Sequence, residues 1–413
     1  MADYQKQKKQ KKGILVILLA ISLFIPWLLS AITFFLSIWI IVPAPTFFLL
    51  TLGVGAPEIS PWLIGGNILA LILIIFKLHQ SWLYNVALIA SLFSLLLSVL
   101  PLWQFPATNE RITQEIQTVL GADYLAKVPQ TAQIQLRRQP FILADAFRGI
   151  AQERIRIDRH LTFATPDNVK LTLNIYRPLA TGKYPAIIII YGGAWRSGTP
   201  NNDEKFSCYM ASQGYSVLAI DYRHAPKYKF PVQLEDVKTA LNYIQINADT
   251  LEVDRSRIAL LGRSAGAHLA MLAAYQPDAI PVKAVVNYYG PVNLAKGYYN
   301  PPFPNPINTR DVLENFLGGT PEELKELYQQ ASPINYVRPN LPPTLLVYPG
   351  RDHIVKPTFG RHLYEKLRVA ENQAIWLEIP WAEHAFDAVF NGVSNQLALY
   401  YTERFLAWAL KSS

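Results

Sequence analysis

The sequence predicts an α/β protein, with a mostly parallel central sheet and helices on both faces, preceded by an α-helical transmembrane region. Two observations predict this organisation. Between Gly13 and Trp103 the only charged residues are Glu58 and Lys77, and from about residue 151 short apolar runs of strand length alternate with helical patterns. We therefore expect three regions: a basic tail and transmembrane helices over 1–105, an amphipathic helix and connector over 106–150, and an α/β domain over 151–413.

Charge and cysteine content exclude some classes of function. The 413-residue chain has a formal net charge of +8, half of it in the first 105 residues, which hold six lysines and two acids. The mild basic excess over the rest of the chain does not favour a nucleic-acid partner. The single cysteine, Cys208, excludes an intrachain disulfide and leaves the redox compartment open.

Three apolar stretches predict membrane spans, at about 14–42, 59–76 and 82–103. The first is longer than the roughly 20 helical residues that cross a bilayer. Thr46–Gly55 is also apolar but short, and we interpret it as an interfacial or re-entrant segment that could instead complete a further crossing. The number of spans therefore stays open between two and four.

The lysine-rich tail predicts the orientation of these spans. Five lysines between Lys6 and Lys12 directly precede the first span, which favours a cytoplasmic amino terminus. Lys77, in the hairpin before the last span, then also lies inside. Three crossings predict a multi-pass protein, in contact with membrane lipid, whose chain from about Arg111 onward faces the extracytoplasmic side. A fourth crossing would reverse this orientation.

An amphipathic helix is expected directly after the last span. Over Ala107–Leu120 the apolar residues fall on one helical face and the charges on the other, and Gly121 provides the stop. We interpret this segment as a juxtamembrane helix and residues up to about 150 as a connector or partial cover.

The remaining chain alternates strands with helices. Alternating polarity predicts two antiparallel strands, at 154–158 and 169–176. Continuous apolar runs predict buried strands at 186–191, 216–220, 257–261, 283–288, 345–348 and 375–379. Helical patterns occupy 203–213, 230–245, 267–274, 358–369 and 396–411. Active sites in such sheets lie at the carboxyl ends of the strands.

One strand end carries a candidate nucleophile, Ser264. Gly262-Arg-Ser-Ala-Gly266 follows the apolar strand 257–261 and precedes an apolar helix. This context is the one that G-x-S-x-G requires, since the serine occupies a sharp strand-to-helix turn with its hydroxyl exposed. Gly262 and Gly266 are expected because the turn brings backbones too close for a side chain.

Two further strand ends supply the partners that a serine needs. A neighbouring imidazole must take the hydroxyl proton, and a carboxylate must orient that imidazole. His384 follows the last predicted strand and Asp352 follows the preceding one. Three other histidines fit the role of general base less well. His353 is next to the proposed acid, His268 lies on the helix after Ser264, and His79 lies in the membrane hairpin. Two rival acids are too near His384 in sequence to face its far nitrogen: Glu383 and Asp387.

A glycine pair predicts donors for a developing oxyanion. Gly192 and Gly193 follow a buried strand, and no side chain blocks their backbone N–H groups. Together with the N–H of Ala265 they would form an oxyanion hole. An ordinary strand-to-loop turn is the alternative for the two glycines alone.

The motifs together resemble a known family over about residues 150–410. They are Tyr191–Trp195, Asp221–Pro226, Gly262–Gly266, Gly350–Asp352 and Glu383–Phe386. This set is similar to the α/β-hydrolase esterases of the hormone-sensitive-lipase-like and feruloyl-esterase-like group. The resemblance implies an α/β-hydrolase fold, ester hydrolysis by Ser264, Asp352 and His384, and a purely structural role for Asp221–Pro226. Tyr191 stands where that group usually has histidine, and Arg263 replaces its usual acidic or small residue.

The sequence thus predicts a membrane-anchored serine ester hydrolase that works through an acyl-enzyme and needs no metal or cofactor. Its substrate is expected to be a small-molecule ester or a lipid- or polysaccharide-linked one, and the resemblance favours short or aryl acyl groups. A serine peptidase of the same fold and a non-catalytic membrane scaffold are the alternatives. Oligomeric state stays open, as does whether residues 295–340 form a lid or a plain surface insertion.

Overall fold

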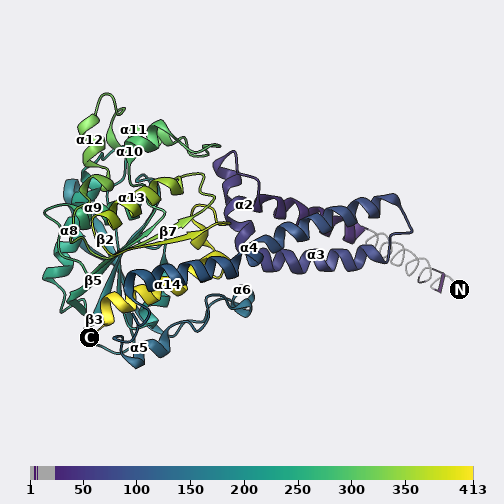
Figure 1. Cartoon of the computed structure of the whole chain (residues 1–413), viewed down its shortest axis with the longest axis horizontal. Helices are drawn as coiled ribbons and strands as arrows, with labels where there is room; N and C mark the ends of the chain where they lie inside the picture. The colour runs from purple at the N-terminus through teal and green to yellow at the C-terminus, as the bar shows by residue number, and fades with distance from the viewer. Residues whose placement is uncertain (1–3, 6, 8–23, 413) are drawn as a thin grey trace.

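An elongated helical bundle projects from one side of an α/β domain (Figure 1). The computed structural model describes residues 4, 5, 7 and 24–412. The basic tail is therefore almost wholly outside the described residues, as are residues 14–23 of the predicted first span. The bundle and the domain meet along the base of the bundle, which brings residues of the predicted membrane region close to the ends of the sheet strands (Figure 1).

In the described part of the chain eight strands form one sheet, in the order β1-β2-β4-β3-β5-β6-β7-β8. From β4 to β8 neighbouring strands are parallel, while β2 pairs antiparallel with both β1 and β4. The prediction of a mostly parallel sheet with an antiparallel edge is confirmed. The strands are β1 (Ile155–Ala164), β2 (Leu171–Pro178), β3 (Tyr184–Ile190), β4 (Ser216–Ile220), β5 (Val253–Arg263), β6 (Ala284–Tyr288), β7 (Thr344–Pro349) and β8 (Ala374–Ile379).

Helices cover both faces of this sheet (Figure 1). One face carries α8 (Val232–Ile246), α9 (Ala265–Tyr275) and α13 (Pro357–Val369). The other carries α7 (Glu204–Ser212), α14 (Val393–Lys411) and the end of α4 (Trp82–Leu120). Because both faces are covered, central strands such as β3 consist of continuous buried isoleucines rather than alternating residues.

The segment between β6 and β7 is not a plain surface insertion. It contains three short helices, α10 (Leu294–Tyr299), α11 (Thr309–Leu317) and α12 (Lys325–Gln330). Val312, Leu313 and Phe316 of α11 are buried. The Phe316 ring stacks on Trp195 at a centroid distance of 4.1 Å. These contacts place α11 over the strand ends.

The bundle consists of Phe24–Ile40, α3 (Ser60–Ile75) and the first half of α4. Phe24–Ile40 ends in the 3₁₀ turn η1 (Ile38–Ile40), and α2 (Phe47–Glu58) crosses the base of the bundle. Among the described residues α4 alone is long and apolar enough to cross a membrane, and α2 with α3 adds a second candidate if their 79° bend belongs to one broken span.

The predicted last span and the amphipathic segment after it are continuous in the structure. Residues 82–103 and the amphipathic segment 107–120 form one continuous helix, α4, with Pro101 and Pro106 inside it. Ile112 and Ile116, on the apolar face of its second half, are buried in the core of the α/β domain, where α4 packs along β8. That face therefore contacts the sheet rather than a membrane surface.

Short elements complete the described chain. The predicted connector contains α5 (Gln130–Gln135) and α6 (Leu143–Arg148), and three further 3₁₀ turns are η2 (Pro166–Asn168), η3 (Pro333–Tyr336) and η4 (Phe386–Ala388). The last of these turns lies between β8 and α14, directly after His384.

Candidate active site

Ser264 occupies a strained corner between β5 and α9. Its backbone has φ 51° and ψ −119°, a conformation that non-glycine residues rarely adopt. A Cβ on Gly266 would lie 1.9 Å from the carbonyl oxygen of Ile190, and one on Gly262 would lie 2.3 Å from the backbone of Gly266. Both glycines are thus required by close backbone approach, as the sequence predicts.

The three predicted residues of the triad lie together at the strand ends. Nε2 of His384 is 3.0 Å from Oγ of Ser264, and Nδ1 of the same ring is 2.8 Å from Oδ2 of Asp352. Ser264 follows β5, Asp352 follows β7 and His384 follows β8, three parallel strands whose carboxyl ends share one edge. This geometry allows the hydroxyl proton to pass to an imidazole that a carboxylate orients.

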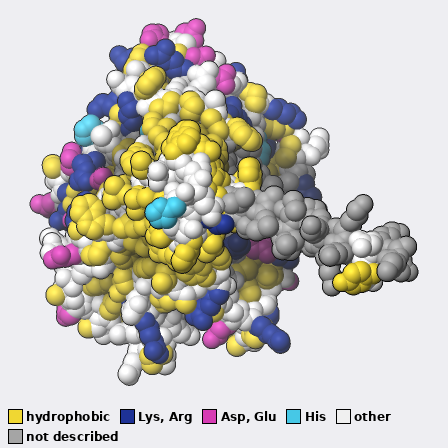
Figure 2. All heavy atoms as spheres, turned by 90° about the vertical axis from the view of Figure 1, so that its right-hand side faces the viewer, with side chains coloured by type: hydrophobic (Ala, Val, Ile, Leu, Met, Phe, Trp, Pro, Cys, Tyr) yellow, Lys and Arg dark blue, Asp and Glu magenta, His cyan; other side chains and the backbone are white. Residues whose placement is uncertain are grey.

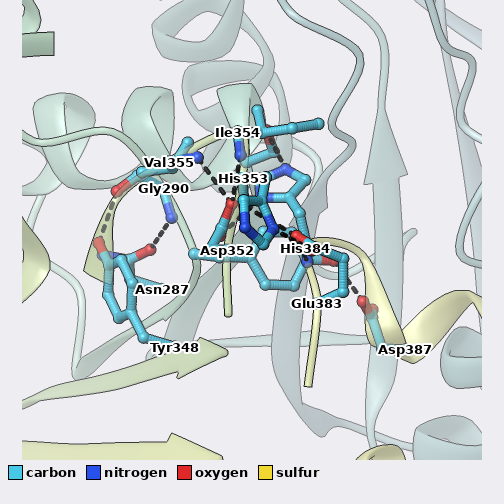
Figure 3. A network of polar contacts seen from close by, with 12 residues as sticks. Asn287, Gly290, Tyr348, Asp352, His353, Ile354, Val355, Glu383, His384 and Asp387 are labelled. Carbon is cyan, nitrogen blue, oxygen red and sulfur yellow. Dashed lines mark hydrogen bonds and ion pairs between the residues drawn. The ribbon is translucent and has the colours of Figure 1, made fainter. Parts of the chain in front are cut away.

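Asp352 is fixed by backbone donors as well as by the imidazole (Figure 3). Its Oδ1 accepts hydrogen bonds from the backbone N–H groups of Ile354 at 2.8 Å and Val355 at 2.7 Å. Burial raises the pKa of the Asp352 carboxyl, while the contact with His384 and the Val355 N–H oppose this shift. The carboxylate is therefore held with one oxygen on the loop and the other toward the ring.

The rival acids have other partners. Glu383 accepts from the ring and the backbone N–H of His353, beside Asp352 (Figure 3). Asp387 accepts from Arg263 and from the hydroxyl of Tyr289. Both carboxylates are thus engaged away from Nδ1 of His384.

The predicted oxyanion loop lies beside the serine corner. Ile190 at the end of β3 pairs with Gly262 at the end of β5, so the loop that follows β3 runs against the turn. A Cβ on Gly192 would lie 3.2 Å from Cβ of Ser264. Gly192 and Gly193 line one cavity at Ser264, and Ala265 lines a second. Their role as oxyanion donors stays a prediction.

Tyr191, at the position that departs from the family pattern, anchors the start of this loop. Its hydroxyl donates to Asp221 at 2.6 Å and lies 2.9 Å from Nε2 of His224. The ring stacks on Tyr222 at 4.5 Å. The Asp221–Pro226 turn therefore contacts the start of the predicted oxyanion loop, in keeping with a structural role.

Sequence reasoning did not predict the contacts that Arg263 makes. The guanidinium is buried between two carboxylates, Asp387 and, at 3.3 Å, Asp203. It also lies over the rings of Phe206 and Tyr288, at 4.7 and 5.2 Å from their centroids. An arginine directly before the nucleophile was the available signal, because a buried guanidinium requires carboxylates nearby.

Two cavities of different size meet at Ser264. The larger is an open cleft of about 840 Å³ that includes His384 in its lining, and the smaller is an apolar pocket of about 60 Å³ that includes Ala265. Four residues of α2 form part of the wall of the larger cleft, which nothing in the local sequence pattern indicated. Across the described residues, no group of three or more His, Cys, Asp or Glu side chains is placed to hold a metal ion.

His268 has a structural role, and its burial leads us to expect that the folding stability depends on pH. Its Nδ1 accepts from the Trp195 indole at 3.2 Å and its Nε2 donates to the carbonyl of Ala331 at 2.6 Å, so the ring is neutral. Burial lowers its pKa from the ordinary 6.5 to about 4. Between these values the unfolded chain binds more protons, so folding stability should fall as pH drops from about 6.5 toward 4, by about 3 kcal/mol from this group.

Thermal unfolding of the detergent-solubilised chain across this pH range measures the effect. His268→Gln keeps a donor and an acceptor but cannot take up the proton, so its stability should depend less on pH than that of the parent. Parallel pH profiles for the two proteins would contradict this assignment.

Comparison with known proteins finds esterases among those similar to this chain. The BD-FAE family model matches residues 173–367. The chain is 33% identical over 257 residues to esterase LipC of Mycobacterium tuberculosis, covering 58% of this chain and 62% of that protein. It is 28% identical over 241 residues to the probable carboxylic ester hydrolase LipM of the same organism, covering 55% of each chain. The chain thus spans less than two thirds of the length of these curated relatives.

Solved structures identify the fold. A bacterial heroin esterase matches with a TM-score of 0.55 at 24% identity, covering 63% of this chain and 85% of that chain. The α/β domain has the α/β-hydrolase fold. A structure of Thermogutta terrifontis esterase 2 phosphoramylated by tabun matches this fold with a TM-score of 0.50 at 24% identity, covering 62% of this chain and 95% of that chain. The two curated relatives are named as an esterase and a probable carboxylic ester hydrolase.

Proposed function

We propose that this protein is a membrane-anchored serine hydrolase that cleaves carboxylic esters with Ser264, His384 and Asp352. The observation that carries the proposal is the pair of contacts on one imidazole, 3.0 Å to the Ser264 hydroxyl and 2.8 Å to the Asp352 carboxylate. The similarity to esterases supports the choice of ester over amide substrates.

The geometry supports a two-stage reaction. Oγ of Ser264 attacks the ester carbonyl carbon while Nε2 of His384 takes the hydroxyl proton, and the backbone N–H groups of Gly192, Gly193 and Ala265 stabilise the resulting oxyanion. The imidazolium then donates that proton to the leaving alcohol oxygen, which leaves an acyl-enzyme. Water, activated by the same imidazole, releases the carboxylic acid and restores the serine.

Labelling with a fluorophosphonate probe tests this proposal on the full chain. The parent should become labelled at Ser264, whereas a non-catalytic scaffold would not. Parallel assays with acyl esters and aminoacyl amides distinguish an esterase from a peptidase of the same fold, and faster amide cleavage would overturn the ester assignment.

The bundle supports membrane anchoring because polar side chains lie between its helices and apolar side chains lie on its outside. Buried side chains between its helices include hydrogen-bonded polar pairs, as in packed membrane helices: Ser30–Ser91, Ser37–Ser94, Ser37–Ser98 and Asn67–Ser98. Large apolar side chains instead face outward and predominate in the end-on view of the bundle (Figure 2). They include Phe24, Phe35, Ile72, Phe76, Trp82, Ile89 and Leu96. Such a surface would be unfavourable in water.

The arrangement of the bundle favours three crossings. The Lys77 hairpin lies at the end of the bundle far from the α/β domain, while α2 lies at the near end (Figure 1). With a cytoplasmic amino terminus, the domain would then face the extracytoplasmic side. Protease added to cells with a permeabilised outer layer should therefore remove a tag placed after Ser413. A tag protected until the inner membrane is broken would contradict three crossings.

A further inference from the structure

One face of α2 forms a wall of the large cleft at Ser264. The four residues that line it are Phe47, Leu50, Thr51 and Val54. Their spacing of three, one and three residues places them on a single face of the helix. A segment of the membrane region thus faces the candidate nucleophile directly.

Two contacts at its ends hold α2 in this position. At its carboxyl end, Oε2 of Glu58 accepts from the backbone N–H groups of Ser394 at 2.9 Å and Asn395 at 3.4 Å, in the first turn of α14. The first N–H groups of a helix have no partner within the helix, so this side-chain oxygen satisfies two of them in α14. Before its amino end, the carbonyl of Ile41 accepts from Arg351, the residue next to Asp352. The wall that α2 forms is therefore attached to the α/β domain at both ends.

The cleft opens beside exposed apolar side chains of α2. Phe47 lines the cleft and is 68% exposed, and the adjacent Phe48 is 84% exposed. The lining of the same cleft also contains polar side chains, including Arg196, Asn201 and Asn202. An occupant with an apolar chain along α2 and a polar part against these side chains would match both kinds of lining.

The position of His384 decides which part of an ester each cavity holds. The imidazole must donate a proton to the leaving alcohol oxygen, so that oxygen must lie within hydrogen-bond reach of Nε2. His384 lines the large cleft but not the small pocket. The alcohol part therefore belongs in the large cleft beside α2. The acyl part belongs in the small pocket, whose volume of about 60 Å³ limits it to a few carbon atoms.

We infer that the substrate is a short-chain acyl ester of a long-chain, amphiphilic alcohol that resides in the lipid bilayer and reaches Ser264 along α2. This inference rests on the proposed function, since it assigns the substrate of the same site. It refines the sequence-based expectation of short acyl groups by adding a large, membrane-derived alcohol.

Two isomeric esters test the inference on the full chain in phospholipid vesicles. Hexadecyl acetate has the short group on the acyl side, and ethyl hexadecanoate has the same atoms with the ester reversed. The parent should cleave hexadecyl acetate with a kcat/KM at least about tenfold higher than that of its isomer. Ethyl acetate, which fits either arrangement, reports the basic activity of the triad.

A matched pair of α2 variants tests the path. Thr51 is exposed and lines the cleft, whereas Phe48 is exposed on another face of the same helix. Thr51→Trp should lower kcat/KM for hexadecyl acetate about tenfold more than it lowers kcat/KM for ethyl acetate. Phe48→Trp, which carries the same indole away from the cleft, should change neither.

A variant of the small pocket tests the acyl side. Gly297 of α10 lines that pocket, where an added Cβ meets only Leu313 within 4 Å. Gly297→Val should slow hexadecyl butanoate about tenfold relative to hexadecyl acetate.

The outcomes separate this inference from the proposed function. Faster cleavage of ethyl hexadecanoate, or equal effects of Thr51→Trp and Phe48→Trp, would overturn the inference while the esterase assignment stands. Failure to cleave ethyl acetate together with absence of fluorophosphonate labelling would overturn both.

Discussion

Replacing Ser264 with alanine is expected to lower kcat for short esters by roughly 10⁴-fold or more, with little change in thermal stability. The hydroxyl is the atom that attacks the carbonyl, and its loss leaves only binding and oxyanion stabilisation. The turn itself should persist, because the glycines at positions 262 and 266 that permit it are unchanged. Initial rates with p-nitrophenyl acetate and a thermal melt of the same samples measure the two effects.

Ser197→Ala is the matched control for this variant. Ser197 also lines the large cleft, where its hydroxyl donates to the carbonyl of Gly193 at 3.2 Å. Loss of this partly exposed hydrogen bond should alter kcat far less. If Ser264→Ala keeps a rate within tenfold of the parent, the nucleophile is assigned to the wrong residue.

Asp352→Asn is expected to lower kcat by roughly 10⁴-fold, because an amide in this position favours the wrong tautomer of the imidazole. Nδ1 of His384 lies 2.8 Å from the carboxylate, whose other oxygen is fixed by two backbone N–H groups. Substrate affinity should change little, since the acid lies behind the ring. The full kinetic profile with p-nitrophenyl acetate separates kcat from KM.

Asp387→Asn provides the comparison. Its carboxylate is paired with Arg263 and Tyr289, so its loss should reduce stability, by up to about 3–5 kcal/mol for a buried pair, more than it reduces kcat. A larger fall in kcat for Asp387→Asn than for Asp352→Asn would move the orienting role to Asp387.

Local sequence patterns were sufficient to predict the sheet and to predict that Ser264, Asp352 and His384 lie close together. Continuous apolar runs identified β3, β5, β7 and β8, because parallel strands with both faces covered need no polar alternation. Once those strands were assigned, the carboxyl ends of three of them brought Ser264, Asp352 and His384 to one edge. Order along the chain then assigned the roles.

Features that depend on long-range contacts escaped sequence reasoning. The apolar face of 107–120 indicates a helix that buries one side, but not whether its partner is lipid or β8. The charge of Arg263 indicates that carboxylates lie near it, but not that they are Asp203 and Asp387. The residues of α2 that line the cleft are ordinary apolar residues in an apolar segment, so only their position in the fold distinguishes them.

The attachment of Glu58 to α14 has a consequence for work with a shortened, water-soluble form of this protein. Removing residues 1–105 would cut α4 within its length, take away the helix that encloses one side of the cleft and leave two N–H groups in the first turn of α14 without their acceptor, Glu58. The loop that carries His384 directly precedes α14. Such a fragment would present a more open site with a less constrained histidine, so its preference among esters would differ from that of the intact chain.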